Sequence, residues 1–281
     1  MIITTIEQIK GVLTTLAAEV NYTDFEPYLK DSEDWVSDEL LGDTIYLAIE
    51  DESITDAKLL RLVVNVIVLK SYDLGIPFMD LVQTRSGFGV ISDKNRTPAS
   101  QNRVDRLIAQ NKFRLSTNIE TLINYLEDNS TYHDNWKSSG SYSLLSDCLI
   151  NTSRQFKRFA PFDGDRNDFI KLKPKLISDS SIKICPAISK AYLNELIAKQ
   201  NADTLSDNDK VILPAVKQAI ANYAIENDLI AYRLIQDVVT ILDNNPDDYT
   251  TYHASNEKLL KDAPGLENLS GNPFFISNTS I

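Results

Sequence analysis

The most carboxylate-rich turn of the chain lies at residues 163–168 and reads Asp-Gly-Asp-Arg-Asn-Asp. Clustered carboxylates of this kind suggest a calcium loop. An EF-hand loop, however, requires glycine at its sixth position and glutamate at its twelfth. Those positions are Asp168 and Pro174, so the pattern fails. The segment is typical of a solvated turn that precedes a helix.

Other residue types that carry chemistry are scattered. His133 and His253 stand in polar stretches without a metal-ligand partner, and Cys148 and Cys185 have neither disulfide nor metal spacing. The glycine pair at 87 and 89 lacks the third glycine and the Lys-Ser/Thr of a phosphate loop. We therefore predict no catalytic residue, no cofactor and no metal. An enzyme whose groups meet only in space remains a third hypothesis.

The segment 80–107 is better explained as structure. Gly87 and Gly89 flank Phe88 between two short apolar runs, which predicts a β-hairpin over about 80–92. Thr97 followed by Pro98 is typical of a helix start. Apolar residues at helical spacing extend this helix over 98–127.

Helical periodicity also dominates the rest of the chain. It predicts a helix near residues 6–20, one over 27–49 and a buried one from Ser53 or Thr55 to Gly75. The β-branched run 63–68 would also suit a strand, but length and the terminal glycine favour a helix. Further helices are expected after Asn151 or Thr152, over 165–183 with a kink or break near Pro174, over 186–199, and after Ser206.

The expected fold is mainly α: a multi-helix bundle of two related helical modules with a small β-hairpin. Residues 1–128 form the first module, 129–141 a polar linker, 142–262 the second module and 263–281 an extended C-terminal tail. The relation between modules rests on a likeness between 53–74 and 205–229. Generic amphipathic similarity is the competing explanation.

Composition narrows the function classes. The 281 residues are 43% hydrophobic and 24% charged, with a formal net charge of −12. Such a charge disfavours a protein that neutralises nucleic-acid phosphates. The N-terminal sequence has no signal-peptide pattern, and the most apolar run, 59–69, is too short to span a membrane. We expect synthesis in a reducing cytoplasm and no membrane contact.

Two segments are candidates for contact with other subunits. Arg85, Arg96 and Arg103 make the hairpin and helix start basic, together with Gly87, Phe88 and Gly89 of the turn. The basic residues are either a solvated face or a contact for an acidic surface. Phe274 and Phe275 in the tail either fold back or dock into a neighbour.

The hairpin segment also carries a resemblance. Its residues are Leu81-Val82-x-Thr84-x-x-Gly87-Phe88-Gly89-Val90-Ile91-Ser92, then Pro98-Ala99-Ser100-x-x-Arg103-Val104-x-Arg106-Leu107. The likeness continues in Leu149-Ile150-x-Thr152, Phe156, Gly164-x-Arg166 and Phe169-x-x-Leu172-x-Pro174. Over roughly residues 55–230 the chain resembles an uncharacterised family of tailed-phage and prophage structural proteins of gut bacteria, which look like head–tail connector or ring proteins.

The resemblance implies a non-enzymatic virion protein at the head–tail junction. Such a subunit would form a homo-oligomeric ring, by analogy with portals a dodecamer, and would contact the portal protein and tail or adaptor proteins. DNA would pass through without sequence-specific binding. The alternative is a soluble prophage-encoded adaptor that has no place in the virion.

Overall fold

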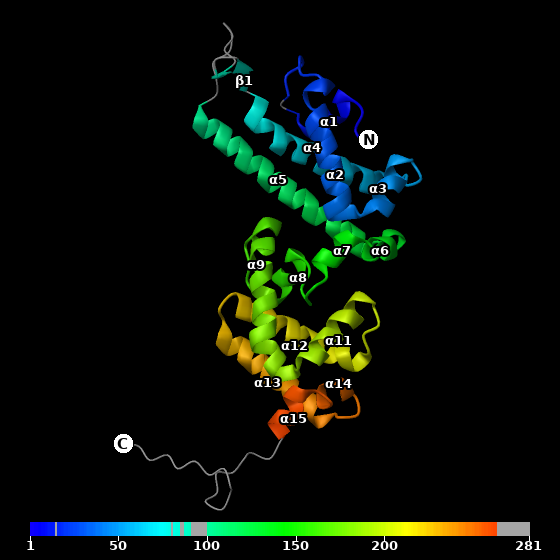
Figure 1. The fold of residues 1–281 in the computed structure, drawn as a ribbon, viewed down its shortest axis with the longest axis vertical. Helices are drawn as coiled ribbons and strands as arrows, with labels where there is room; N and C mark the ends of the chain where they lie inside the picture. Colours follow the sequence, from blue (N-terminus) through cyan, green and yellow to red (C-terminus); the bar gives the residue numbers. More distant parts are fainter. Residues whose placement is uncertain (15, 80, 85–86, 91–99, 263–281) are drawn as a thin grey trace, which may run out of the picture. The chain divides into compact units, whose positions relative to one another are not determined.

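The computed structural model describes the 281 residues except 15, 80, 85–86, 91–99 and 263–281. Its described residues are predominantly helical, which confirms the predicted mainly-α class (Figure 1). The chain divides into two compact units, Met1–Pro174 and Lys175–Ile281. We expected the division at 129–141, whereas it falls inside the helix that contains Pro174.

The first unit consists of helices and one pair of strands. Its elements are α1 (Ile6–Val12), a 3₁₀ turn η1 (Tyr22–Asp24), α2 (Glu26–Val36), a π turn η2 (Ser37–Leu41), α3 (Asp43–Glu50), α4 (Ala57–Met79), β1 (Leu81–Thr84), β2 (Gly87–Val90), α5 (Gln101–Asp128), α6 (Ser130–Lys137), α7 (Gly140–Leu145), α8 (Ser153–Phe159) and the start of α9 (Arg166–Asp179).

The second unit continues from α9. Its elements are the π turn η3 (Ser180–Ile184), α10 (Cys185–Ile188), α11 (Lys190–Asn201), α12 (Asp207–Ala224), α13 (Asp228–Asn244), α14 (Thr250–His253) and α15 (Asn256–Asp262). The tail expected over 263–281, with Phe274 and Phe275, lies outside the described residues.

Helix α4 is the central element of the first unit, because α2 packs on one side of it and α5 on the other (Figure 1). Residues 63–68, whose β-branched side chains also suited a strand, are helical. Val63, Val66 and Ile67 among them are fully buried. The expected cap was wrong. The Asp56 carboxylate accepts the backbone N–H groups of Lys58 and Leu59, and α4 continues past Gly75 to Met79.

The helix expected over 27–49 is broken into α2 and α3. The break lies at η2 and Gly42, whose φ of +77° suits glycine and ends a helix. A Cβ at Gly42 would lie 2.4 Å from the Cβ of Ser139, which explains why no larger residue fits. The first predicted helix is also shorter than expected, because α1 ends at Val12.

Helix α5 begins at Gln101 with Ser100 at its N-cap, and the predicted start at Thr97 and Pro98 lies outside the described residues. Its second half is buried as expected, with Leu122, Ile123 and Leu126 in the core. Leu107, assigned to the same apolar stripe, is instead 40% exposed. Strands β1 and β2 pair antiparallel, with Leu81 opposite Val90 and Thr84 opposite Gly87. The turn between them lies outside the described residues.

The expected linker at 129–141 is helical. It forms α6 and the start of α7, and the Trp136 side chain in α6 is fully buried. The indole N–H of Trp136 donates to the carbonyl oxygen of Leu40 at 2.8 Å, and the ring meets Tyr142 edge to face. This segment belongs to the core because a large aromatic side chain in it outweighs its polar neighbours.

In the second unit the Ser206 cap is confirmed as a capping box with Asp209. The long run after it is divided into α12 and α13 at residues 225–227. The helix expected over 186–199 is likewise divided, because Ser189 has a φ of +72° between α10 and α11. The predicted break at Pro174 is not seen, since α9 continues through it to Asp179.

Candidate functional site

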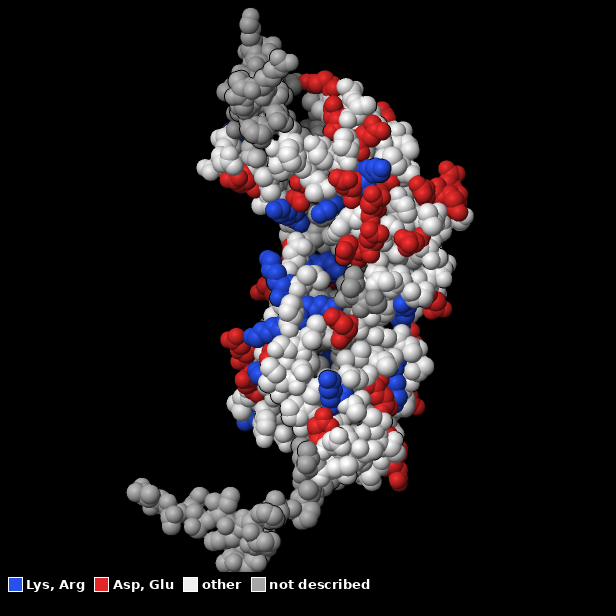
Figure 2. All heavy atoms as spheres, in the orientation of Figure 1, with Lys and Arg blue, Asp and Glu red and all other residues white. Residues whose placement is uncertain are grey.

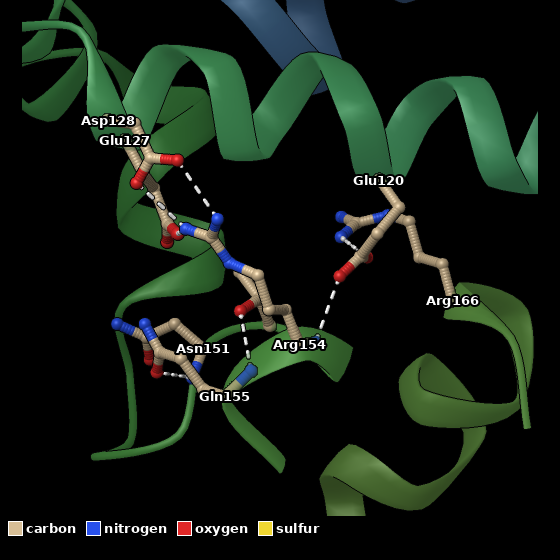
Figure 3. A network of polar contacts seen from close by, with 8 residues as sticks. Glu120, Glu127, Asp128, Asn151, Arg154, Gln155 and Arg166 are labelled. Carbon is tan, nitrogen blue, oxygen red and sulfur yellow. Dashed lines mark hydrogen bonds and ion pairs between the residues drawn. The ribbon is translucent and has the colours of Figure 1, made fainter. Parts of the chain in front are cut away.

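A network of polar contacts in the first unit lies where α5, α8 and the start of α9 meet (Figure 3). Glu120 and Glu127 are seven residues apart on α5, so both carboxylates lie on one face of the helix. Figure 3 shows them pointing toward Arg154 of α8 and Arg166 of α9.

Arg154 forms a fork with the C-terminal end of α5. Its two terminal nitrogens each lie 2.9 Å from an oxygen of Asp128, and one of them lies 3.5 Å from a Glu127 oxygen. The Arg154 hydrogen bond lowers the pKa of Asp128. Burial raises the pKa of Glu127, which is only 16% exposed, and the positive charge of Arg154 offsets this in part. The pKa values of the two neighbouring carboxyls are therefore shifted in opposite directions.

Glu120 is held between a helix terminus and a guanidinium. One oxygen accepts the backbone N–H of Arg154 in the first turn of α8 at 3.0 Å, where the helix dipole favours a negative charge. The other lies 3.6 Å from the Arg166 guanidinium, whose side chain is 7% exposed. Burial lowers the pKa of Arg166, although an arginine remains charged.

The start of α8 is fixed by its own sequence. The Thr152 hydroxyl accepts the Gln155 N–H at 3.2 Å, and the Gln155 side chain accepts the Asn151 N–H at 3.0 Å. The Gln155 side chain thus bonds to the residue before the N-cap, while Thr152 is the cap. Of the two caps expected, Asn151 or Thr152, the structure has Thr152, and its bond fixes the turn of α8 that bonds to Glu120.

A polar hollow of about 470 Å³ adjoins the network through Asp128. Its lining residues are Lys58, Thr121, Asn124, Tyr125, Asp128, Asn129 and Ser130. The Tyr125 hydroxyl donates to Asp56, the residue that caps α4, and this bond lowers the pKa of Asp56. Lys58 lies over the Tyr125 ring, 4.4 Å from its centroid. These contacts tie α4, α5 and α6 together.

The contacts of this arrangement hold helices together. Each carboxylate of the network on α5 has a cationic or N–H partner, and these partners come from two helices, α8 and α9, that are distant from it in sequence. Across the described part of the chain, no group of three or more His, Cys, Asp or Glu side chains has the geometry to hold a metal ion.

The residues expected to contact other subunits lie elsewhere. Gly87, Phe88 and Gly89 form β2, opposite Thr84, Gln83 and Val82 of β1. Arg103 is exposed in the first turn of α5. Arg85, Arg96, Phe274 and Phe275 lie outside the described residues.

Sequence reasoning missed the network. Arg154 and Arg166 are separated from Glu120 by more than thirty residues, and no local pattern pairs them. The available signal was the placement of Glu120 and Glu127 beside the buried stripe of α5, because carboxylates at such positions need partners.

Acidic side chains are concentrated on another part of the first unit. Residues 24–56 contain twelve Asp or Glu and one Lys, whereas the rest of the chain has a net charge of −1. Figure 2 shows red side chains gathered over α2 and the end of α3. The acidic excess is therefore concentrated in one stretch of the sequence, residues 24–56.

A family model matches just under half of the chain, over residues 9–144: a family of unknown function (DUF6712). The matched segment contains α2 to α6, and so includes Glu120, Glu127 and Asp128 but neither Arg154 nor Arg166. No curated protein and no solved structure matches the chain. Among the described helices, none combines the length and apolar character needed to cross a membrane.

Proposed function

We propose that the chain is a non-enzymatic structural subunit of a tailed-phage particle, a head–tail connector that forms a ring below the portal. The resemblance of the hairpin and α5 segment to phage structural proteins supports this proposal. The structural observation that carries it is the exposure of the first half of α5. None of residues 101–110 is buried, although the second half of the same helix lies in the core.

A helix with this distribution is anchored at one end and exposed at the other. Its anchored end is fixed by the apolar contacts with α4 and by the bonds of Asp128 and Glu120 to Arg154. The exposed end includes Phe113, whose side chain is 61% exposed. Exposed aromatic side chains on a rigid element are typical of protein interfaces. In a ring, each such surface meets a different surface of the next subunit.

We also infer that the two units follow one plan, as two related modules. Gly42 and Ser189 have nearly the same backbone angles, with φ and ψ of 77° and 154° against 72° and 148°. Each is followed by a helix, a second residue with positive φ (Glu52 or Asp203) and a packed helix pair, α4 with α5 or α12 with α13. The sequence Thr-Tyr-His then recurs at 131–133 and 251–253.

The test is the composition of the particle. Particles made by the genome that encodes the chain are purified and examined by mass spectrometry and by imaging of the head–tail junction. We expect the chain in particles at a fixed ratio to the portal protein. Its absence from purified particles, together with its presence in the cell lysate, would contradict the connector and support the soluble adaptor.

A further inference from the structure

One face of the exposed half of α5 carries basic and apolar side chains together. Arg103, Arg106, Leu107, Gln110 and Phe113, here called the α5 stripe, are spaced so that they lie on one side of the helix. All five are exposed, Leu107 at 40% and Phe113 at 61%. The buried residues Asn111 and Leu115 lie on a different face, toward α4.

A surface of opposite charge lies away from the α5 stripe, on α3 and η2. Asp43, Leu47 and Glu50 share one face of α3, next to Asp38 and Glu39 of η2, and these five residues are here called the acidic face. All five are exposed, and Leu47 is 55% exposed between carboxylates. An exposed leucine within an acidic surface matches exposed Leu107 and Phe113 within a basic one.

The positions of the two surfaces prevent them from meeting within one chain. The α5 stripe lies in the first half of α5, whereas α3 contacts η2 and α6, the helix that follows the C-terminal end of α5. The two surfaces therefore lie toward opposite ends of the first unit (Figure 1). Two complementary surfaces on opposite sides of one molecule form a heterologous contact, which repeats from copy to copy.

We propose that the α5 stripe of one copy docks on the acidic face of the next copy. The inference rests on the proposed ring function and names its subunit contact. Leu107 and Phe113 would cover Leu47, while Arg103 and Arg106 face the carboxylates of Asp38 and Glu39. Charges at the edge of such a contact set its orientation and its salt dependence.

The experiment is a charge swap measured by sedimentation equilibrium of the whole chain. The wild type should associate at about 50 mM salt and dissociate at about 500 mM, where exposed charges are screened. The variants Arg103→Glu/Arg106→Glu and Asp38→Lys/Glu39→Lys should each weaken association at least about tenfold. The chain that carries all four substitutions should regain it, because the charges are again opposite.

The control for the arginine variant is Arg158→Glu/Arg233→Glu, which changes the net charge by the same amount and sign at exposed positions of α8 and α13. It should associate like the wild type. Three outcomes overturn the inference: a wild type that stays monomeric at about 1 mM and low salt, swap variants that behave like the control, or a four-fold variant that does not recover. Presence in particles is measured separately, so a chain that assembles but is absent from particles contradicts the proposed function alone.

Discussion

The guanidinium of Arg154 and the carboxylate of Asp128 form two parallel hydrogen bonds, each 2.9 Å long. This fork joins α8 to the C-terminal end of α5. The backbone N–H of the same arginine donates to Glu120, which lies about two turns earlier in α5. A single residue of α8 therefore holds three acidic side chains of α5, since Glu127 lies 3.5 Å from the same guanidinium.

Replacement of Arg154 by alanine should destabilise the protein by about 1–2 kcal/mol at pH 7. The exposed fork contributes little, and most of the loss comes from Glu127, which is buried and loses its cation. The raised pKa of Glu127 stabilises the fold below the carboxyl pKa of the unfolded chain, and this stabilisation is lost as pH rises through the folded pKa. The lowered pKa of Asp128 acts in the opposite sense and is lost with Arg154.

Both effects make the loss of folding stability in Arg154→Ala largest at neutral pH and smaller below about pH 4. Urea unfolding of variant and wild type between these pH values measures it. Arg158→Ala, exposed on the same helix, is the control and should change stability by less than about 0.5 kcal/mol. A loss of stability in Arg154→Ala that is independent of pH would show that the ionisation of Glu127 does not depend on Arg154.

Glu120 and Arg166 should be coupled. Glu120→Gln leaves the Arg166 charge at a side chain that is 7% exposed, and Arg166→Met leaves the Glu120 charge at one that is 17% exposed. Either single change should cost about 3 kcal/mol. The double variant removes both charges and should cost less than the sum of the single losses, by about 1–3 kcal/mol. A double-mutant cycle from denaturant unfolding gives this difference, and additive losses would mean that the pair does not interact.

Asp209 should fix the second unit through its ionised form. Burial alone would raise its pKa, but hydrogen bonds from Ser206 and Lys199 outweigh this and lower it. Tyr192 also donates to it at 3.1 Å. A lowered pKa stabilises the fold above the carboxyl pKa of the unfolded chain, and this stability is lost as pH falls through the folded value.

Asp209→Asn should therefore cost about 2–3 kcal/mol at pH 7 and less below about pH 3. The matched control is Asp207→Asn, two residues away, because the Asp207 side chain is 99% exposed. It should be nearly neutral. Thermal unfolding across the pH range measures the stability of both variants. An equal loss of stability in the two would contradict the role given to Asp209.

Gly42→Ala should destabilise the first unit by more than about 2 kcal/mol. The new Cβ would meet Ser139 at 2.4 Å, on a residue with a φ of +77°. Gly11→Ala is the matched control, since nothing lies within 4 Å of a Cβ there and the residue is helical. It should be neutral or stabilise by up to about 1 kcal/mol. Calorimetry of both variants compares them, and similar melting temperatures would contradict the close approach at Gly42.

The local sequence was informative where a helix is decided by neighbours within a few residues. The mainly helical class follows from apolar spacing, and the caps at Ser206 and Thr152 follow from side chains that bond three residues away. The buried half of α5 was likewise predicted, because apolar spacing of three and four residues defines one face of a helix.

Features that depend on distant residues were missed or misplaced. The polar appearance of 129–141 predicted a linker, but Trp136 finds its partner at Leu40, almost a hundred residues earlier. Leu107 fits the apolar period of α5, yet its side chain is 40% exposed, whereas Leu122 and Leu126 later in the same helix are fully buried. Periodicity reports which residues share a face and not whether another element covers that face.

The sequence by itself determined the helical class, several helix starts and the amount of net charge. Only the tertiary structure decided that acidic residues of η2 and α3 gather away from the α5 stripe, that this stripe is exposed, and that Arg154 joins three carboxylates. The physical reason is range. Caps and helical faces arise from contacts within one or two turns, whereas burial, ion pairing and the opposition of surfaces are set by helices that meet only after folding.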